Sequence, residues 1–415
     1  MKSLEGSVAG KMLCAFVGTA FLLVAAAWSE ERVSVRYLCN GEKVIPVVCS
    51  IGNWRITDIK LPDLVLTNNG GTALDVECAE ILGFVSGTEA VRVRISGGEL
   101  REAIRNTAGW LGDPNTPLPA VQLSFGEVAL PEGAIAEGTG VDAGKSAVLP
   151  FSKISYLHHV GQSALDGMEI RLTMNVEPGR KKTLVFPVQL VFYRSRGDYL
   201  FPLKGDLRIA YTPLSYIHHR ASGSQEFGMD IVAAVQKGAA SFTDISLPEP
   251  KQLSDYGIWG RDVLAIGDGI VAGIGDKFPE ERMCDPALFA KPGYTSGLLK
   301  ELLPAIGWTN AVAGNYVIID HRNGEFSMYA HLQEGSILVK ARESVKKGQV
   351  VGKVGNTGNS GAPHLHFQLM DSADFFTANG LPVMFGNVPE DAIISEYPVE
   401  ANCLAFSDSI YGSVP

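Results

Sequence analysis

The sequence lacks several features that would point to common classes of protein. It contains six cysteines but no C-x-x-C pair, so a zinc site built from cysteines is not expected. Charged residues make up 19% of the chain, the formal net charge is −10, and no basic stripe is present. This balance argues against a protein that binds nucleic acid. After the N-terminal region, no second hydrophobic run is long enough to span a membrane.

The N-terminal region carries the one long hydrophobic run. Lys2 and Lys11 precede "MLCAFVGTAFLLVAAAW", small residues at Ala25 to Ala27 offer a cleavage site, and the polar stretch "SEER" follows. This arrangement predicts a signal peptide over residues 1–28, with an uncleaved membrane anchor as the alternative. We therefore expect export, to the periplasm or the extracellular side of the cell envelope.

Removal of the signal peptide leaves five cysteines: Cys39, Cys49, Cys78, Cys284 and Cys403. Five is an odd number, so at least one thiol is free or pairs between chains. Cys39 and Cys49 flank a short loop, and in an oxidising compartment they make the expected disulfide.

Length and composition predict a mainly β protein of two or three domains. Short strands broken by turns over residues 30–201 predict a β-sandwich-like accessory domain. Its one expected helix is "GELREAIRNTAGWLG", where Leu100, Ile104 and Leu111 share a face. Residues 202–388 predict a second, compact antiparallel β domain, with a helical piece, "SGLLKELLPAIG", in an insertion. Residues 389–415 form a tail too short to be a domain.

The second domain holds the residues that could carry chemistry. The stretch "GNTGNSGAPHLHF" places His364 and His366 two apart, and in a strand both imidazoles would project from one face. The segment "YAHL" adds His331, and "EFGMDI" adds Glu226 and Asp230, which would share a strand face if the segment is extended. Imidazoles and carboxylates are zinc ligands, and a catalytic zinc site keeps one position for water.

These segments resemble one known family. "GNYVIIDH", "YAHL" and "GQVVGKVGNTGNSGAPHLHF" match the motifs of the lysostaphin-type (LytM-type) zinc metallopeptidases, peptidase family 23 of the metallo class. The resemblance covers about residues 216–370 and is most specific at "GNTGNSGAPHLHF". It implies a compact antiparallel β domain that hydrolyses peptide bonds in bacterial peptidoglycan or similar glycine-containing peptides.

The resemblance also implies roles for individual residues. Asp230 and His366 would be Zn²⁺ ligands, while His331 and His364 would flank the metal-bound water. One of these two histidines would take or relay the proton, and the other would stabilise the developing oxyanion.

At one position the chain departs from the family pattern. The family has a histidine ligand four residues before the aspartate, where this chain has Glu226. We predict that Glu226 ligates the zinc directly. Two alternatives remain open: His219, or less readily His218, supplies the missing imidazole, or the site is catalytically dead.

The predicted function is that of an exported zinc metalloendopeptidase acting on peptidoglycan crosslinks. The alternative is a degenerate LytM-type domain that binds cell wall or regulates a partner hydrolase, and a peptidase of other exported proteins is a third hypothesis. The N-terminal domain is expected to inhibit the site modestly, because the junction "YIHHRASGSQEF" runs straight into it. Binding another envelope protein is an alternative role for that domain.

Overall fold

The computed structural model describes residues 28–30, 32–38, 44–51, 53–125, 135–211, 219–236, 242–243, 250–388, 393–394 and 409–414. Nearly all of the predicted signal peptide, most of the tail, His218 and Cys39 lie outside these residues. The signal peptide and the Cys39–Cys49 disulfide therefore stay predictions. Cys78 is a buried free thiol and Cys284 an exposed one.

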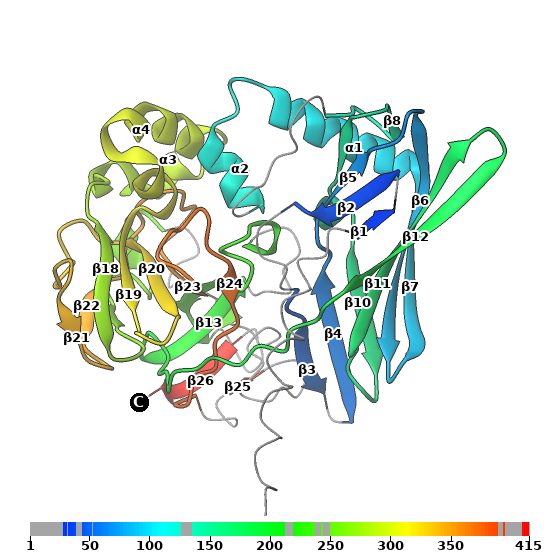
Figure 1. Cartoon of the computed structure of the whole chain (residues 1–415). Coiled ribbons are helices and arrows are strands. Elements are labelled where there is room, and N and C mark those ends of the chain that lie inside the picture. Colours follow the sequence, from blue (N-terminus) through cyan, green and yellow to red (C-terminus); the bar gives the residue numbers. More distant parts are fainter. Residues whose placement is uncertain are drawn as a thin grey trace, which may run out of the picture.

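Three antiparallel sheets make up an N-terminal unit (Figure 1). Their orders are β1-β2-β5-β9, β10-β4-β3 and β12-β11-β6-β7, with β8 paired to β6. Buried and partly exposed residues alternate along these strands, as expected when one face of a sheet packs on a core. In β11 the buried residues are Met168, Ile170, Leu172 and Met174. The strands are β1 (Trp28–Glu30), β2 (Val33–Tyr37), β3 (Val47–Ile51), β4 (Trp54–Lys60), β5 (Leu64–Asn68), β6 (Leu74–Val85), β7 (Thr88–Ser96), β8 (Gly140–Val141), β9 (Ser146–Leu149), β10 (Tyr156–Gly161), β11 (Gly167–Glu177) and β12 (Arg180–Val188).

A larger antiparallel sheet forms the C-terminal unit. Its order is β21-β18-β19-β20-β23-β14-β13-β26-β25, with β24 paired to β23, and every residue of the central strand β23 is buried. The mainly β, antiparallel fold is thus confirmed. The strands are β13 (Gly205–Tyr211), β14 (Met229–Ala233), β15 (Val235–Gln236), β16 (Phe242–Thr243), β17 (Asp262–Leu264), β18 (Gly269–Gly275), β19 (Asn315–Asp320), β20 (Phe326–Leu332), β21 (Ser344–Val345), β22 (Val350–Lys353), β23 (Leu365–Met370), β24 (Gly380–Leu381), β25 (Ile393–Ile394) and β26 (Ser409–Val414).

The helices lie outside these sheets. The predicted helix in the N-terminal unit is α1 (Gly97–Gly112), which begins with a capping box between Ser96 and Glu99. Leu100 and Ile104 are buried as expected, whereas Leu111 is half-buried against a second apolar cluster. The helical piece of the insertion is α4 (Tyr294–Ala313), and α2 (Leu118–Phe125) was not predicted. The remaining helices are α3 (Pro286–Phe289) and the 3₁₀ turns η1 (Phe151–Lys153), η2 (His219–Ala221), η3 (Leu253–Asp255) and η4 (Glu280–Met283).

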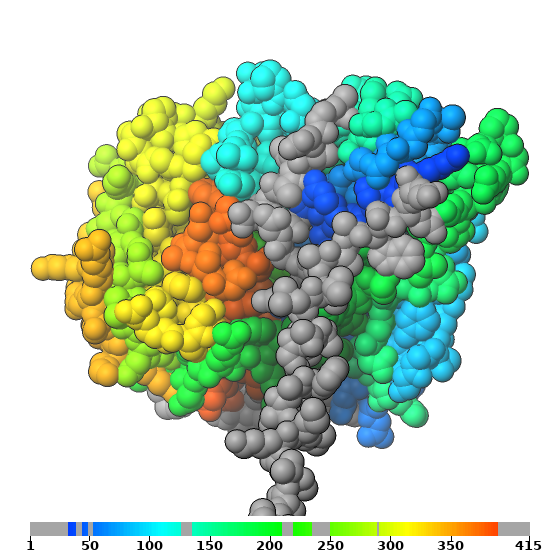
Figure 2. All heavy atoms as spheres, viewed as in Figure 1, coloured from blue at the N-terminus to red at the C-terminus, as the bar shows by residue number. Residues whose placement is uncertain are grey.

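Helix α2 joins the two units across the top of the molecule as drawn. In Figure 2 its residues, in cyan, lie against yellow and orange residues of the C-terminal unit. Leu123 of α2 packs on an apolar cluster that includes Ala313 and Phe375. Among the described residues, no helix has both the length and the apolar character needed to cross a membrane.

Candidate metal centre and catalytic site

Three neighbouring strands of the C-terminal sheet assemble the centre of the site. β14 and β20 flank β23, and the register places Asp230 and Ala330 opposite His366. Directly opposed residues of antiparallel strands project from the same face, so the Asp230 carboxylate and the His366 imidazole meet. His366 Nδ1 lies 3.0 Å from Asp230 Oδ1.

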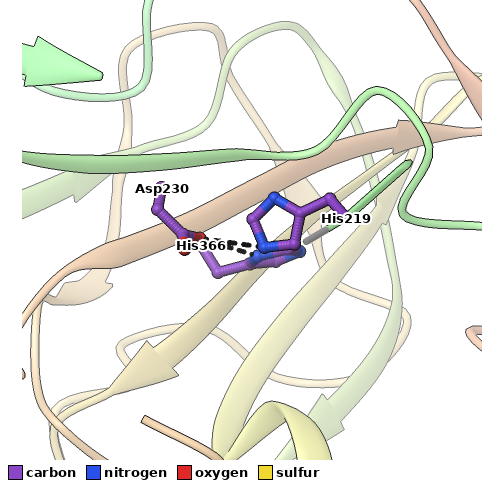
Figure 3. A group of neighbouring side chains, drawn as sticks. All are labelled: His219, Asp230 and His366. Carbon is purple, nitrogen blue, oxygen red and sulfur yellow. Dashed lines mark hydrogen bonds and ion pairs between the residues drawn. The ribbon is translucent and has the colours of Figure 1, made fainter. Parts of the chain in front are cut away.

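A second imidazole reaches the same carboxylate from outside the sheet. His219 lies in the turn η2, and its Nε2 is 3.4 Å from Asp230 Oδ1. One ligand atom from each of His219, Asp230 and His366 lies within 4.8 Å of the others, and all three residues are buried (Figure 3). Gly228 allows the His366 ring to pack closely against the backbone here, because a Cβ at this position would lie only 3.2 Å from His366 Cε1.

The other two histidines complete the group. His364 Nε2 lies 3.4 Å from Asp230 Oδ1, so the expectation that His364 and His366 share a face is met. The His331 ring centroid is 4.6 Å from that of His364 and 6.0 Å from that of His366. The structure therefore brings together four of the five predicted site residues, and it adds His219.

Each imidazole is held by one ring nitrogen, which fixes how the other nitrogen can act. Outward N–H groups donate from His366 Nε2 to Gln368 Oε1 (2.7 Å) and from His219 Nδ1 to the Gly228 carbonyl (3.3 Å). His366 Nδ1 and His219 Nε2, the nitrogens that face Asp230, would then be the ones to bind a metal ion there. Such polar partners orient the ring and select the tautomer of a metal-binding histidine.

His331 and His364 follow the same rule. His331 Nδ1 donates to the Thr357 carbonyl at 2.6 Å, and His364 Nδ1 donates to the Ala362 carbonyl at 2.7 Å. The Nε2 atom of each ring is thereby left to accept a proton or, once protonated, to donate one.

Backbone geometry at the end of β20 aims the His331 side chain. His331 has a φ of 61°, a left-handed conformation that costs a residue with a Cβ roughly 1–3 kcal/mol. The glycine-rich loop, residues 355–361, stabilises this conformation through Thr357, whose hydroxyl donates to the Leu332 carbonyl at 2.8 Å. The loop can lie this close to the end of β20 only through glycine, because a Cβ on Gly355 would lie 2.6 Å from Leu332 C.

Glu226, the predicted third ligand, lies elsewhere. Its carboxylate is 3.9 Å from Lys60 Nζ, and it lines a small pocket between the two units that does not include Asp230. The prediction required an extended backbone from Glu226 to Asp230, but β14 begins only at Met229 and a turn precedes it. Burial raises the pKa of Glu226, an effect that Lys60 and Arg220 oppose.

The placement of His219 and Glu226 predicts opposite effects of replacing them. His219→Ala removes a candidate ligand and is expected to weaken zinc binding by more than about 100-fold, whereas Glu226→Gln stays within about threefold of the natural protein. Competition against a chromophoric chelator measures both affinities. If the Glu226 variant lost zinc and the His219 variant kept it, the prediction that Glu226 ligates the zinc would be restored.

Charge in the group follows from burial and from the Asp230 carboxylate. Burial alone would raise the pKa of Asp230, but His364 and His219 hold it well below its usual range, so the group is ionised. Burial lowers the pKa of His331 well below its ordinary value, and His364 and His366 lower it further. Burial also opposes protonation of His364, but Asp230 raises its pKa above the ordinary value.

Asp230 and the four imidazoles of the group face one cleft of about 640 Å³. Its other walls come from the turn after His219, from the loop before His364, from Val312 at the end of α4 and from Leu123 of α2. Leu123 belongs to the N-terminal unit, and its carbonyl accepts a hydrogen bond from Gly223 N at 3.0 Å. Sequence reasoning missed Leu123, because α2 was not predicted.

A half-buried carboxylate outside the cleft also contacts the glycine-rich loop. Glu280 Oε1 accepts a hydrogen bond from Asn356 N at 3.3 Å, and burial raises the pKa of Glu280 to about 7. The folded protein holds the Glu280 proton more tightly than the unfolded chain does, because the pKa of Glu280 is higher in the folded state. This difference contributes fully to stability below about pH 4.5, and the contribution is lost as the pH rises through about 7.

Glu280→Gln keeps an oxygen for Asn356 and removes this titration. At pH 8 we expect the free energy of unfolding of the variant to exceed that of the natural protein by about 1 kcal/mol, because solvent screens part of the effect of the Glu280 charge. At pH 4.5 we expect little difference. Denaturant unfolding of metal-free protein at the two pH values measures the difference. An equal change at both pH values would contradict the assignment.

Part of the chain is similar to known peptidases. Residues 303–380 match the model of peptidase family M23. Over 100 residues the chain is 39% identical to the peptidoglycan DD-endopeptidase ShyA of Vibrio cholerae serotype O1, a match covering 24% of this chain and 20% of the relative. It is 41% identical over 68 residues to the glycyl-glycine endopeptidase ALE-1 of Staphylococcus capitis, covering 16% of this chain and 18% of the relative. Each match spans about a fifth of the relative's length.

Among solved structures, the catalytic domain of lysostaphin from Staphylococcus simulans is similar at 22% identity, over 43% of this chain and 88% of that one, with a TM-score of 0.23. A putative peptidase M23 from Pseudomonas aeruginosa is similar at 17% identity, over 60% of this chain and 79% of that one, with a TM-score of 0.24.

Proposed function

Residues 303–380 match peptidase family M23, and from that premise we propose that this protein is an exported zinc metalloendopeptidase that hydrolyses peptide crosslinks of bacterial peptidoglycan. The observation that carries the proposal is the group of His219, Asp230 and His366, with ligand atoms within 4.8 Å of one another, in a cleft that also holds two further imidazoles. The names of the peptidoglycan DD-endopeptidase and glycyl-glycine endopeptidase relatives support the substrate class.

The donor atoms fit zinc. Two imidazole nitrogens and one carboxylate oxygen are ligands that catalytic zinc takes, and three protein ligands leave a position open. His219 Nε2, Asp230 Oδ1 and His366 Nδ1 would hold the ion. When bound, zinc makes water more acidic and polarises a carbonyl.

His331 and His364 have the geometry for proton transfer and for stabilising negative charge. Thr357 and Ala362 hold the Nδ1–H groups, so both Nε2 atoms are available to the cleft. A neutral Nε2 accepts a proton from the attacking water, and a protonated Nε2 donates to the oxygen on which negative charge develops. The peptide bond is then broken when the departing nitrogen receives a proton from one of these rings.

The position of His219 favours an enzyme over a degenerate binding domain. Glu226 stands where the resemblance requires a histidine, yet an imidazole from η2 lies beside Asp230. The active form therefore needs no histidine at position 226.

The proposal is tested by incubating the full mature chain with purified peptidoglycan and analysing the soluble products by mass spectrometry. Zinc-loaded protein should release crosslink-cleaved fragments, and chelator-stripped protein should not. Zinc-loaded protein that sediments with peptidoglycan but releases nothing would favour the degenerate alternative. Cleavage of exported proteins without cleavage of peptidoglycan would favour the third hypothesis.

Export forms part of the proposal. The basic residues, the apolar run and the small residues of 1–28 support a cleaved signal peptide and action on the extracellular side of the membrane. An envelope protein partner for the N-terminal unit remains a proposal of the same kind.

Leu123 offers a test of inhibition by the N-terminal unit. Leu123→Ala removes apolar contact worth ~1 kcal/mol between α2 and the cleft wall, so kcat/KM for crosslinked peptides should rise roughly threefold to tenfold. Steady-state kinetics measure the change, and Leu118→Ala, at an exposed position of the same helix, is the matched control. Unchanged or lower kcat/KM for the Leu123 variant would count against inhibition by α2.

A further inference from the structure

The turn that carries His219 is anchored to the N-terminal unit. Arg220, the residue after His219, places Nη1 at 2.8 Å from Asp58 Oδ1 and donates from Nη2 to the Asp58 carbonyl at 3.1 Å. Asp58 lies on β4, 162 residues earlier in the chain. The opposite oxygen, Asp58 Oδ2, lies 3.2 Å from His158 Nδ1 on the neighbouring strand β10.

Two lysines of the same unit hold the next residues. Lys153 Nζ donates to the Ala221 carbonyl at 3.1 Å, and Lys60 Nζ donates to the Ser222 carbonyl at 3.5 Å. Three successive residues after His219 are therefore bound by side chains from the N-terminal unit.

Burial makes the ion pair the strongest of these anchors. The side chains of Arg220 and Asp58 are both 0% exposed. A guanidinium that loses its carboxylate partner inside a protein is strongly destabilising, because neither water nor another charge replaces the interaction. The turn cannot leave its position, and the N-terminal unit cannot separate, without breaking this pair.

By contrast, Asp230 and His366 lie on paired strands of the C-terminal sheet. Those two groups come from a single unit, but His219 depends on a turn held from the other unit. We propose that Asp58 is a positioning residue for the metal site, which it completes by holding η2 through Arg220, and that metal binding and docking of the N-terminal unit are coupled. The inference rests on the proposed function.

The coupling works in both directions. If docking of the unit places His219 and so raises the affinity for zinc, zinc must stabilise the docked arrangement by the same factor. The N-terminal unit then has two effects on the site: α2 narrows the cleft, and β4 positions a ligand.

Zinc affinity of full-length variants tests the proposal. Asp58→Asn should weaken zinc binding about 10- to 100-fold in chelator competition, as does loss of other groups that orient metal ligands. The matched control is Asp166→Asn, which alters a carboxylate of the same unit that accepts a hydrogen bond from Ser86 N at 2.7 Å. The control should bind zinc as the natural protein does.

Unchanged affinity in Asp58→Asn, or an equal loss in both variants, would overturn the proposal. A natural protein that binds no zinc would instead refute the proposed function itself.

Hydrogen exchange of the natural protein gives a second test that needs no variant. Zinc should slow exchange in β4 and in residues 219–222 by about tenfold relative to β7, because it stabilises the docked turn. Slowing confined to β14 and β23 would overturn the coupling while leaving the metal site intact.

Discussion

Replacing Asp230 by alanine is expected to abolish both zinc binding and hydrolysis. Asp230 Oδ1 lies within 3.4 Å of a nitrogen of His219, His364 and His366, so this one oxygen contacts three of the four imidazoles. His364 and His219 keep the pKa of Asp230 well below its usual range, against the effect of burial, so it supplies the negative charge among the proposed ligands at neutral pH.

Loss of that charge should weaken zinc binding by more than the 10- to 100-fold typical of outer partners of a metal site, and peptidoglycan cleavage should fall to background. Metal content after dialysis and product release measure the two effects. Asp262→Ala, at an exposed carboxylate paired with Lys353, is the control and should behave as the natural protein. A fully loaded Asp230 variant would contradict the proposed ligand set.

Replacing His331 or His364 by alanine is expected to remove most of the activity while leaving the metal in place. Neither residue belongs to the proposed ligand set, and both present Nε2 to the cleft. Loss of a group that transfers a proton typically lowers the rate by about 10²–10⁴-fold, so kcat should fall by that factor.

Single-turnover cleavage together with zinc content separates chemistry from metal loss. His159→Ala, on β10 of the N-terminal unit, is the matched histidine control and should retain full activity. Zinc loss equal to that of the Asp230 variant would show that the residue is a ligand. Full activity with zinc retained would remove it from the catalytic roles proposed here.

The core of the site was predictable because Asp230 and His366 lie on regular strands and His364 directly precedes one of them. His364 and His366 are two apart, the strand period is two, and both rings reach Asp230 Oδ1. The same regularity explains the alternating strands of the N-terminal unit and the buried Leu100 and Ile104 of α1.

The other features of the site could not be predicted, because they depend on backbone geometry that short sequence patterns do not specify. Spacing four residues before Asp230 pointed to Glu226, but a turn replaces the extended backbone there and directs its carboxylate toward Lys60. His219 was only an alternative, because its position depends on an ion pair with Asp58, 162 residues away. Nor did any short pattern indicate the left-handed φ of His331 or the place of α2 over the cleft.

Anomalous diffraction at the zinc absorption edge, from crystals of the full mature chain grown with zinc, tests the central claim most directly. We predict one peak at about 2.0–2.2 Å from His219 Nε2, Asp230 Oδ1 and His366 Nδ1. A peak bound by the Glu226 carboxylate, or zinc-loaded crystals without a peak in the cleft, would contradict the proposed centre.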